Sequence, residues 1–123
     1  MLPDKFEDKE RLYRAVYPHK IFWKYDEKGR LSLSSAALRD KNGLSVDRGY
    51  FRGDQEVIES MQKRLEGRII SFEVLDCQEV GASVKYKPSL SNEYHSEVHG
   101  GENQITLSAM QRKKLSRVAR ILT

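Results

Sequence analysis

The chain has 123 residues, of which 33% are charged and 38% apolar, and its formal net charge is +4. This length predicts one domain with a single core, and the clustered aromatic and β-branched residues exclude a chain that is disordered throughout. No stretch approaches the roughly 20 apolar residues of a membrane span. The single cysteine, Cys77, excludes an intrachain disulfide, and the charged N-terminus does not fit a signal peptide, so we expect a cytoplasmic protein.

Short apolar segments separated by turn signals run through the whole chain. Residues 26–29, Asp-Glu-Lys-Gly, are one such turn and predict a hairpin between the segments that flank them. Pro18 and Pro88 each end a segment rich in strand formers. We expect strands over residues 12–17, 21–25, 31–33, 44–46, 68–74 and 83–87, and single helical turns over 34–39 and 75–81.

Two longer segments have the apolar spacing of amphipathic helices. The first covers about 54–66 and begins at Asp54, a good N-cap residue. The second covers about 108–122, where Ser108 and Gln111 make a capping box. The order of elements predicts an α+β fold, in which a mixed or mainly antiparallel sheet packs against these two main helices.

The stretch from Glu93 to Gly101 holds two of the three histidines with a carboxylate between them. As a strand, it places His95, Glu97 and His99 on one face, because successive side chains of a strand point to opposite sides. As a helix, it would be capped by Asn92. We favour the strand, since Tyr94, His95, Ser96 and Val98 are weak helix formers.

Three roles are open for this row of polar side chains. A strand separates His95 from His99 by about 13 Å, so a divalent metal would need a remote ligand such as His19. Without a metal, one histidine would move a proton while Glu97 orients its ring. The row would otherwise only face water. We predict no cofactor and retain a divalent metal as an alternative.

Arg14 lies in the middle of an otherwise apolar strand. A guanidinium there needs an anionic partner or an exposed strand face. A structural ion pair would satisfy it, and so would a phosphate group of a bound ligand. If the strand of Arg14 neighbours that of Glu97, the two side chains share one site.

The order of Arg14, Ser34–Ser35 and Glu97 resembles the order of arginine, serine and glutamate in mono-ADP-ribosyltransferases. This resemblance implies an arginine on the first strand and a late glutamate that bind and activate NAD. The chain departs from that pattern because it is short, its serine segment has a helical pattern, and His95 stands where the paired-glutamate form has its first acid.

Taken whole, the chain is similar to small uncharacterised bacterial or phage proteins. That resemblance spans most of the chain and implies no particular activity. The features that carry it are Arg14 with Pro18, Ser34-Ser35-Ala36-Ala37, Leu44-Ser45-Val46, and His95 with Glu97.

The C-terminal helix combines an apolar stripe with a basic outer face. Lysine and arginine on one face can neutralise phosphates, and the loop Arg48–Arg52 adds Tyr50 and Phe51, which can stack on unpaired bases. An acidic protein surface would also fit this charge, and a solvated face needs no partner at all. The basic residues expected on the outer face are Arg112, Lys113, Arg117 and Arg120.

These features support two hypotheses of different classes. In the first, a cytoplasmic protein acts on a nucleotide or nucleic-acid phosphate that Arg14 and Ser35 bind, and His95, Glu97 and His99 provide acid–base catalysis. In the second, a non-enzymatic regulator or inhibitor of bacterial or phage origin binds nucleic acid or protein through the basic C-terminal helix. Whether the chain is an enzyme, and its oligomeric state, are left open.

Overall fold

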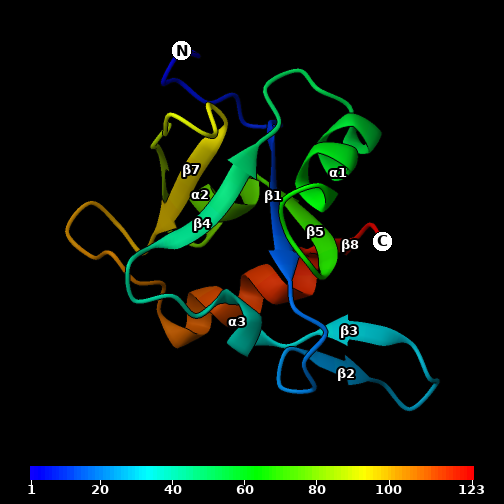
Figure 1. Ribbon diagram of the computed structural model, residues 1–123. Coiled ribbons are helices and arrows are strands. Elements are labelled where there is room, and N and C mark those ends of the chain that lie inside the picture. Colours follow the sequence, from blue (N-terminus) through cyan, green and yellow to red (C-terminus); the bar gives the residue numbers. More distant parts are fainter.

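Six of the eight strands form one antiparallel sheet at the centre of the fold (Figure 1). The computed structural model describes residues 1–123. The order across the sheet is β6-β7-β4-β1-β5-β8. These strands are β1 Arg11–Val16, β4 Leu44–Arg48, β5 Arg68–Glu73, β6 Ser83–Tyr86, β7 His95–His99 and β8 Arg120–Ile121. The α+β fold predicted from the sequence is confirmed, with an antiparallel sheet.

A separate hairpin and four helical segments complete the chain. The hairpin joins β2 (Trp23–Tyr25) to β3 (Leu31–Leu33), as its central turn predicts. The helices are the 3-10 turn η1 (Ser35–Leu38), α1 (Asp54–Gln62), α2 (Val74–Glu79) and α3 (Ala109–Val118). No helix is both long enough and apolar enough to span a membrane.

Both main helices end earlier than their apolar spacing predicts. The helix α1 ends at Gln62 instead of residue 66, and α3 ends at Val118 instead of residue 122. Beyond α3, Arg120 and Ile121 leave the helix and pair with Ser71 and Ile70 of β5. Main-chain pairing with the sheet therefore outweighs the helical periodicity at the C-terminus.

The two helix starts also differ from each other. Ser108 caps α3 and completes the predicted capping box with Gln111. By contrast, Gly53 is the N-cap of α1, and Asp54 is the first helical residue. The Asp54 carboxylate accepts a hydrogen bond from the Tyr13 hydroxyl at 2.5 Å, so it contacts the sheet instead of capping the helix.

The register of the sheet divides its side chains between two faces. Leu12 pairs with Phe72 and Arg14 with Ile70, and this face builds the larger core beneath α2, α3 and η1. Tyr13 and the residues in register with it point the other way, where α1 packs Val57 and Met61 against Tyr13. On that second face, β4, β7 and β6 carry polar side chains that are mostly exposed or half-buried.

Candidate functional site

The predicted row of polar residues lies on β7, as the strand interpretation requires. Ser45 pairs with Glu97 and Asp47 with His95, so the row shares the second sheet face with Ser45 and Asp47. The Nε2 atom of His99 lies 2.8 Å from Oε1 of Glu97. Of the two histidines that Glu97 could orient, the carboxylate therefore contacts His99.

His95 has its own partners on the neighbouring strands. Its Nδ1 lies 2.8 Å from the backbone carbonyl oxygen of Lys87, and its Nε2 lies 3.4 Å from the hydroxyl of Ser45. A carbonyl oxygen only accepts hydrogen bonds, so Nδ1 carries the proton in this contact. In the neutral ring, Nε2 is then the acceptor that faces Ser45.

Arg14 does not join this row. Tyr13 pairs with Asp47 and shares the face of His95, so Arg14, the next residue, points to the opposite face. The strand β4 also separates β1 from β7. The guanidinium donates to the carbonyls of Ala37 at 3.3 Å and Ser45 at 2.8 Å, and burial lowers its pKa. The condition for a site shared by Arg14 and Glu97, neighbouring strands, is therefore not met.

The remaining metal-ligand candidate also lies apart from the row. His19 is in the loop between β1 and β2, where its Nδ1 accepts a hydrogen bond from the backbone N–H of Ile21 at 3.1 Å. No group of three His, Cys, Asp or Glu side chains is placed to hold a metal ion together. The arrangement thus offers the Glu97–His99 pair without a third ligand.

The four basic residues predicted for the C-terminal helix have three different environments. Arg112 is half-buried and donates from Nη1 to the carbonyl of Leu107 at 2.8 Å. Arg120 belongs to β8 and pairs with Ser71, so it shares the face that carries α1. Lys113 and Arg117 remain exposed and lie one turn apart on α3.

A groove of about 550 Å³ is lined by residues of α3, of the β2–β3 hairpin and of the start of η1. Lys113 and Arg117 line it from the helix, and Lys24 lines it from the hairpin. Its hydroxyl groups come from Ser32, Ser34, Ser35 and Ser116. No carboxylate or imidazole lines the groove. We call this feature the cationic groove.

Local structure fixes the walls of the cationic groove. Lys24 and Ser32 are opposite each other in the hairpin register, so both point to one side of it. The Ser34 side chain caps η1 through the N–H of Ala36, while the Ser34 N–H donates to the carbonyl of Phe22 at 2.7 Å. These bonds tie the hairpin to η1, which itself packs against α3.

Comparison of the chain with known protein families, with curated proteins and with solved structures gave no match.

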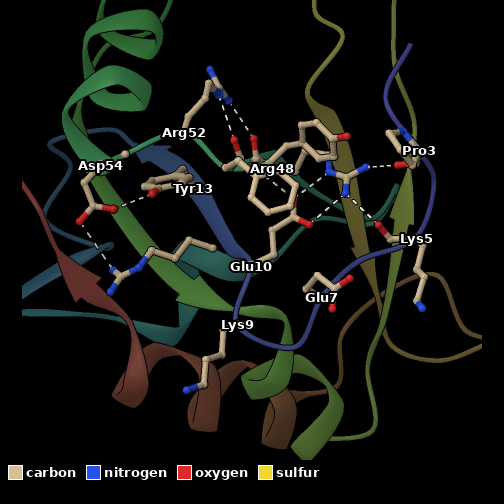
Figure 2. A pocket seen from close by; sticks show the side chains of 14 residues that line it. Pro3, Lys5, Glu7, Lys9, Glu10, Tyr13, Arg48, Arg52 and Asp54 are labelled. Atoms are coloured by element: carbon tan, nitrogen blue, oxygen red, sulfur yellow. Dashed lines mark hydrogen bonds and ion pairs between the residues drawn. The ribbon is translucent and has the colours of Figure 1, made fainter.

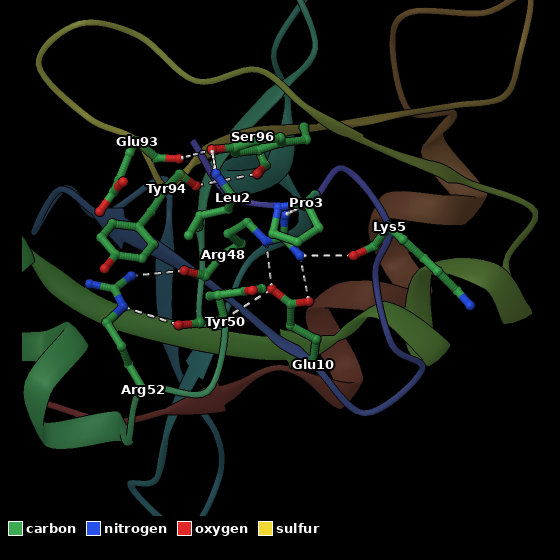
Figure 3. A network of polar contacts seen from close by, with 12 residues as sticks. Leu2, Pro3, Lys5, Glu10, Arg48, Tyr50, Arg52, Glu93, Tyr94 and Ser96 are labelled. Carbon is green, nitrogen blue, oxygen red and sulfur yellow. Dashed lines mark hydrogen bonds and ion pairs between the residues drawn. The ribbon is translucent and has the colours of Figure 1, made fainter.

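The predicted loop Arg48–Arg52 begins at the last residue of β4, and its arginines do not have their predicted role. Arg48 is fully buried and is no phosphate ligand, because it pairs with Glu10 and donates to the carbonyls of Pro3 and Lys5 (Figure 3). Its guanidinium also lies 4.1 Å from the ring centroid of Phe6. The polar N-terminal segment carries no periodicity that would have revealed these contacts.

Arg52 is likewise held within the protein. Its guanidinium lies 3.4 Å from the ring centroid of Tyr94, and it donates to the carbonyls of Arg48 and Gly49 (Figure 3). Among the residues of this loop that were predicted to contact a ligand, only Phe51 is fully accessible to solvent, with 90% of its surface exposed. The loop thus exposes an aromatic side chain, whereas the guanidinium groups of Arg48 and Arg52 are engaged in contacts within the protein.

Proposed function

We propose that this protein binds the phosphate backbone of a nucleic acid in the cationic groove. The observation that carries the proposal is the lining of the groove, which has three cationic side chains and four serines but no acidic side chain. Lysine and arginine release condensed counterions when they neutralise phosphates, and hydroxyl groups donate hydrogen bonds to phosphate oxygens. These groups come from two regions distant in sequence, the β2–β3 hairpin with η1 and the helix α3.

The same lining supports binding without turnover. The groove has neither an imidazole nor a carboxylate that could act as a general base. The Glu97–His99 pair lies on the second sheet face, whereas α3 covers the first. A binding module of the regulator or inhibitor class fits this separation better than an enzyme that acts on the bound phosphate.

The proposal is tested by measuring fluorescence anisotropy of a labelled 20-nucleotide single strand and of the matching duplex. The triple variant Lys24→Gln, Lys113→Gln and Arg117→Gln should weaken binding of at least one probe by about tenfold or more. The matched control changes two lysines and one arginine outside the groove, Lys63→Gln, Lys87→Gln and Arg120→Gln.

The control triple removes the same charge from exposed positions and should change the affinity less than the groove triple by a wide margin. Equal losses in the two triples would mean that only the net charge matters. Failure of either nucleic acid to bind the unaltered protein would refute the proposal, and an acidic protein surface would then be the remaining partner for the groove.

Acid–base chemistry at Glu97 and His99 is the second candidate function, favoured by the 2.8 Å contact between them. A carboxylate that fixes the ring of a histidine is a common arrangement for proton transfer near neutral pH. Screening of nucleotide and oligonucleotide hydrolysis tests this candidate. Any turnover should fall in both Glu97→Ala and His99→Ala but persist in the groove triple, and turnover that survives both substitutions would refute it.

A further inference from the structure

A second cavity of about 580 Å³ opens between the N-terminal segment and the Gly49–Gly53 loop (Figure 2). Its walls come from residues 3–11, from Tyr13 of β1 and from the start of α1. None of its lining residues belongs to the cationic groove. We call it the N-terminal cavity.

The rim of the N-terminal cavity is built from strained backbone. Tyr50 and Phe51 have φ angles of 46° and 65°, which is the left-handed region that side chains other than glycine rarely adopt. Such strain persists only where surrounding contacts hold it, and it concentrates at ligand sites. Here the N–H of Tyr50 donates to Glu10 at 3.1 Å, and the N–H of Gly49 donates to the carbonyl of Arg11 at 2.8 Å.

The strained turn presents two aromatic rings to a ligand. The rings of Tyr50 and Phe51 meet edge to face with centroids 5.0 Å apart. Because Tyr50 also contacts Arg48, it anchors the pair, while Phe51 is 90% exposed at the rim of the cavity. An exposed phenylalanine in an unfavourable conformation is a ready stacking surface for a planar ring.

Deeper in the cavity, Tyr13, Asp54 and Arg11 form a connected polar group. The Tyr13 hydroxyl donates to Oδ1 of Asp54 (Figure 2). Nη1 of Arg11 lies 3.7 Å from Oδ2 of the same carboxylate. Burial, followed by the bond to Asp54, raises the pKa of Tyr13, so the hydroxyl stays protonated and remains a donor. The Asp54 carboxylate is partly exposed and keeps lone pairs for a further N–H donor.

The charges around the cavity favour an anionic ligand. Five cationic and three anionic side chains line it, an excess of two positive charges. Arg48 and Glu10 neutralise each other, while Lys5 and Lys9 are exposed and form no ion pair. The unpaired ammonium groups are therefore free to meet a phosphate, and Arg11, whose contact with Asp54 leaves both side chains partly exposed, can add a guanidinium donor.

We propose that the N-terminal cavity binds a nucleoside monophosphate. Its base stacks on Phe51 beside Tyr50, N–H groups of the base donate to Asp54, and the phosphate meets Arg11 and Lys9. Guanosine 5′-monophosphate is the best probe, because guanine presents two neighbouring N–H groups that a carboxylate can accept together. This site is independent of the nucleic-acid binding proposed for the groove.

The test is to titrate the ¹⁵N-labelled protein separately with guanosine 5′-monophosphate, with guanosine and with inorganic phosphate. Binding is monitored through the changes in amide chemical shifts. The nucleotide should shift the amides of Gly49–Asp54 and bind more tightly than either of its halves. Phe51→Ala and Arg11→Gln should each weaken it by about tenfold. Phe51→Trp should retain binding, because it keeps a stacking surface.

Tyr25→Ala is the matched control, since Tyr25 is an exposed aromatic residue that lines neither cavity. It should bind the nucleotide as the unaltered protein does, and so should the groove triple. The absence of nucleotide binding, equal affinity for phosphate alone, or full binding by Phe51→Ala would each overturn the proposal. None of these outcomes bears on oligonucleotide binding in the groove.

Discussion

Arg48 and Glu10 form an ion pair that is closed off from solvent, with side-chain exposures of 0% and 7%. The bond is bidentate, because Nε of Arg48 lies 2.7 Å from one carboxylate oxygen and Nη2 lies 2.9 Å from the other. One of these oxygens also accepts the N–H of Tyr50. A single carboxylate therefore joins the N-terminal segment to β4 and to the strained loop.

Removal of this carboxylate should be strongly destabilising. Glu10→Ala leaves a buried guanidinium without its counter-ion, and we expect the free energy of unfolding to fall by about 3–5 kcal/mol. Urea denaturation measures this loss. Glu7→Ala is the control, since Glu7 is exposed and forms no ion pair, and it should cost about 0.5 kcal/mol or less. Similar losses in the two variants would contradict a structural role for the pair.

The strain at Phe51 predicts an unusual order of stabilities. Phe51→Gly removes the ring and relieves the strain of the left-handed backbone conformation. Phe51→Val also removes the ring but places a β-branched residue in that conformation. We expect the glycine variant to be more stable than the valine variant by about 1–2 kcal/mol in urea denaturation. At an ordinary extended position valine would be the more stable, so that order would show that the loop is not strained.

Cys77 should make the protein less stable in alkaline solution. Burial raises the pKa of this thiol from 9.0 to about 12. As the pH rises, the unfolded chain therefore loses the thiol proton before the folded protein does. The contribution of the thiol to the free energy of unfolding is fully present below pH 9 and is lost as the pH rises toward 12.

Cys77→Ala removes this contribution to the pH dependence. Between pH 9 and pH 11 the free energy of unfolding should fall less steeply in the variant than in the unaltered protein. The two slopes should differ by up to about 1.4 kcal/mol per pH unit. Urea denaturation at several pH values measures both slopes. Tyr13 is present in both proteins and adds the same alkaline loss to each. Identical slopes would mean that the thiol is accessible to water in the folded state.

The charge of the cationic groove predicts how the affinity for nucleic acid depends on salt concentration. If Lys24, Lys113 and Arg117 each meet one phosphate, the plot of log affinity against log salt concentration should lose about 0.7–0.9 of slope for each residue replaced by glutamine. Anisotropy titrations at several salt concentrations measure this slope. His95→Ala, Glu97→Ala and His99→Ala should leave it unchanged, because their side chains lie on the other sheet face. A slope that follows those three residues would move the interface to that face.

Local patterns in the sequence were sufficient to predict most elements of the fold. The weak helix formers of residues 94–98 predict β7, the turn residues predict the β2–β3 hairpin, and the Ser108–Gln111 capping box predicts the start of α3. These features depend on neighbours within a few residues, so the sequence alone determines them.

The candidate sites depend on which distant segments come together, and only the tertiary structure decides that. The sheet order places β4 between Arg14 and Glu97, and pairing with β5 turns the predicted end of α3 into β8. The packing of η1 and the hairpin beside α3 brings Ser35 to Lys113 and Arg117. Strand order and register assign each side chain to a face, and neither is encoded in the spacing of residues along one strand.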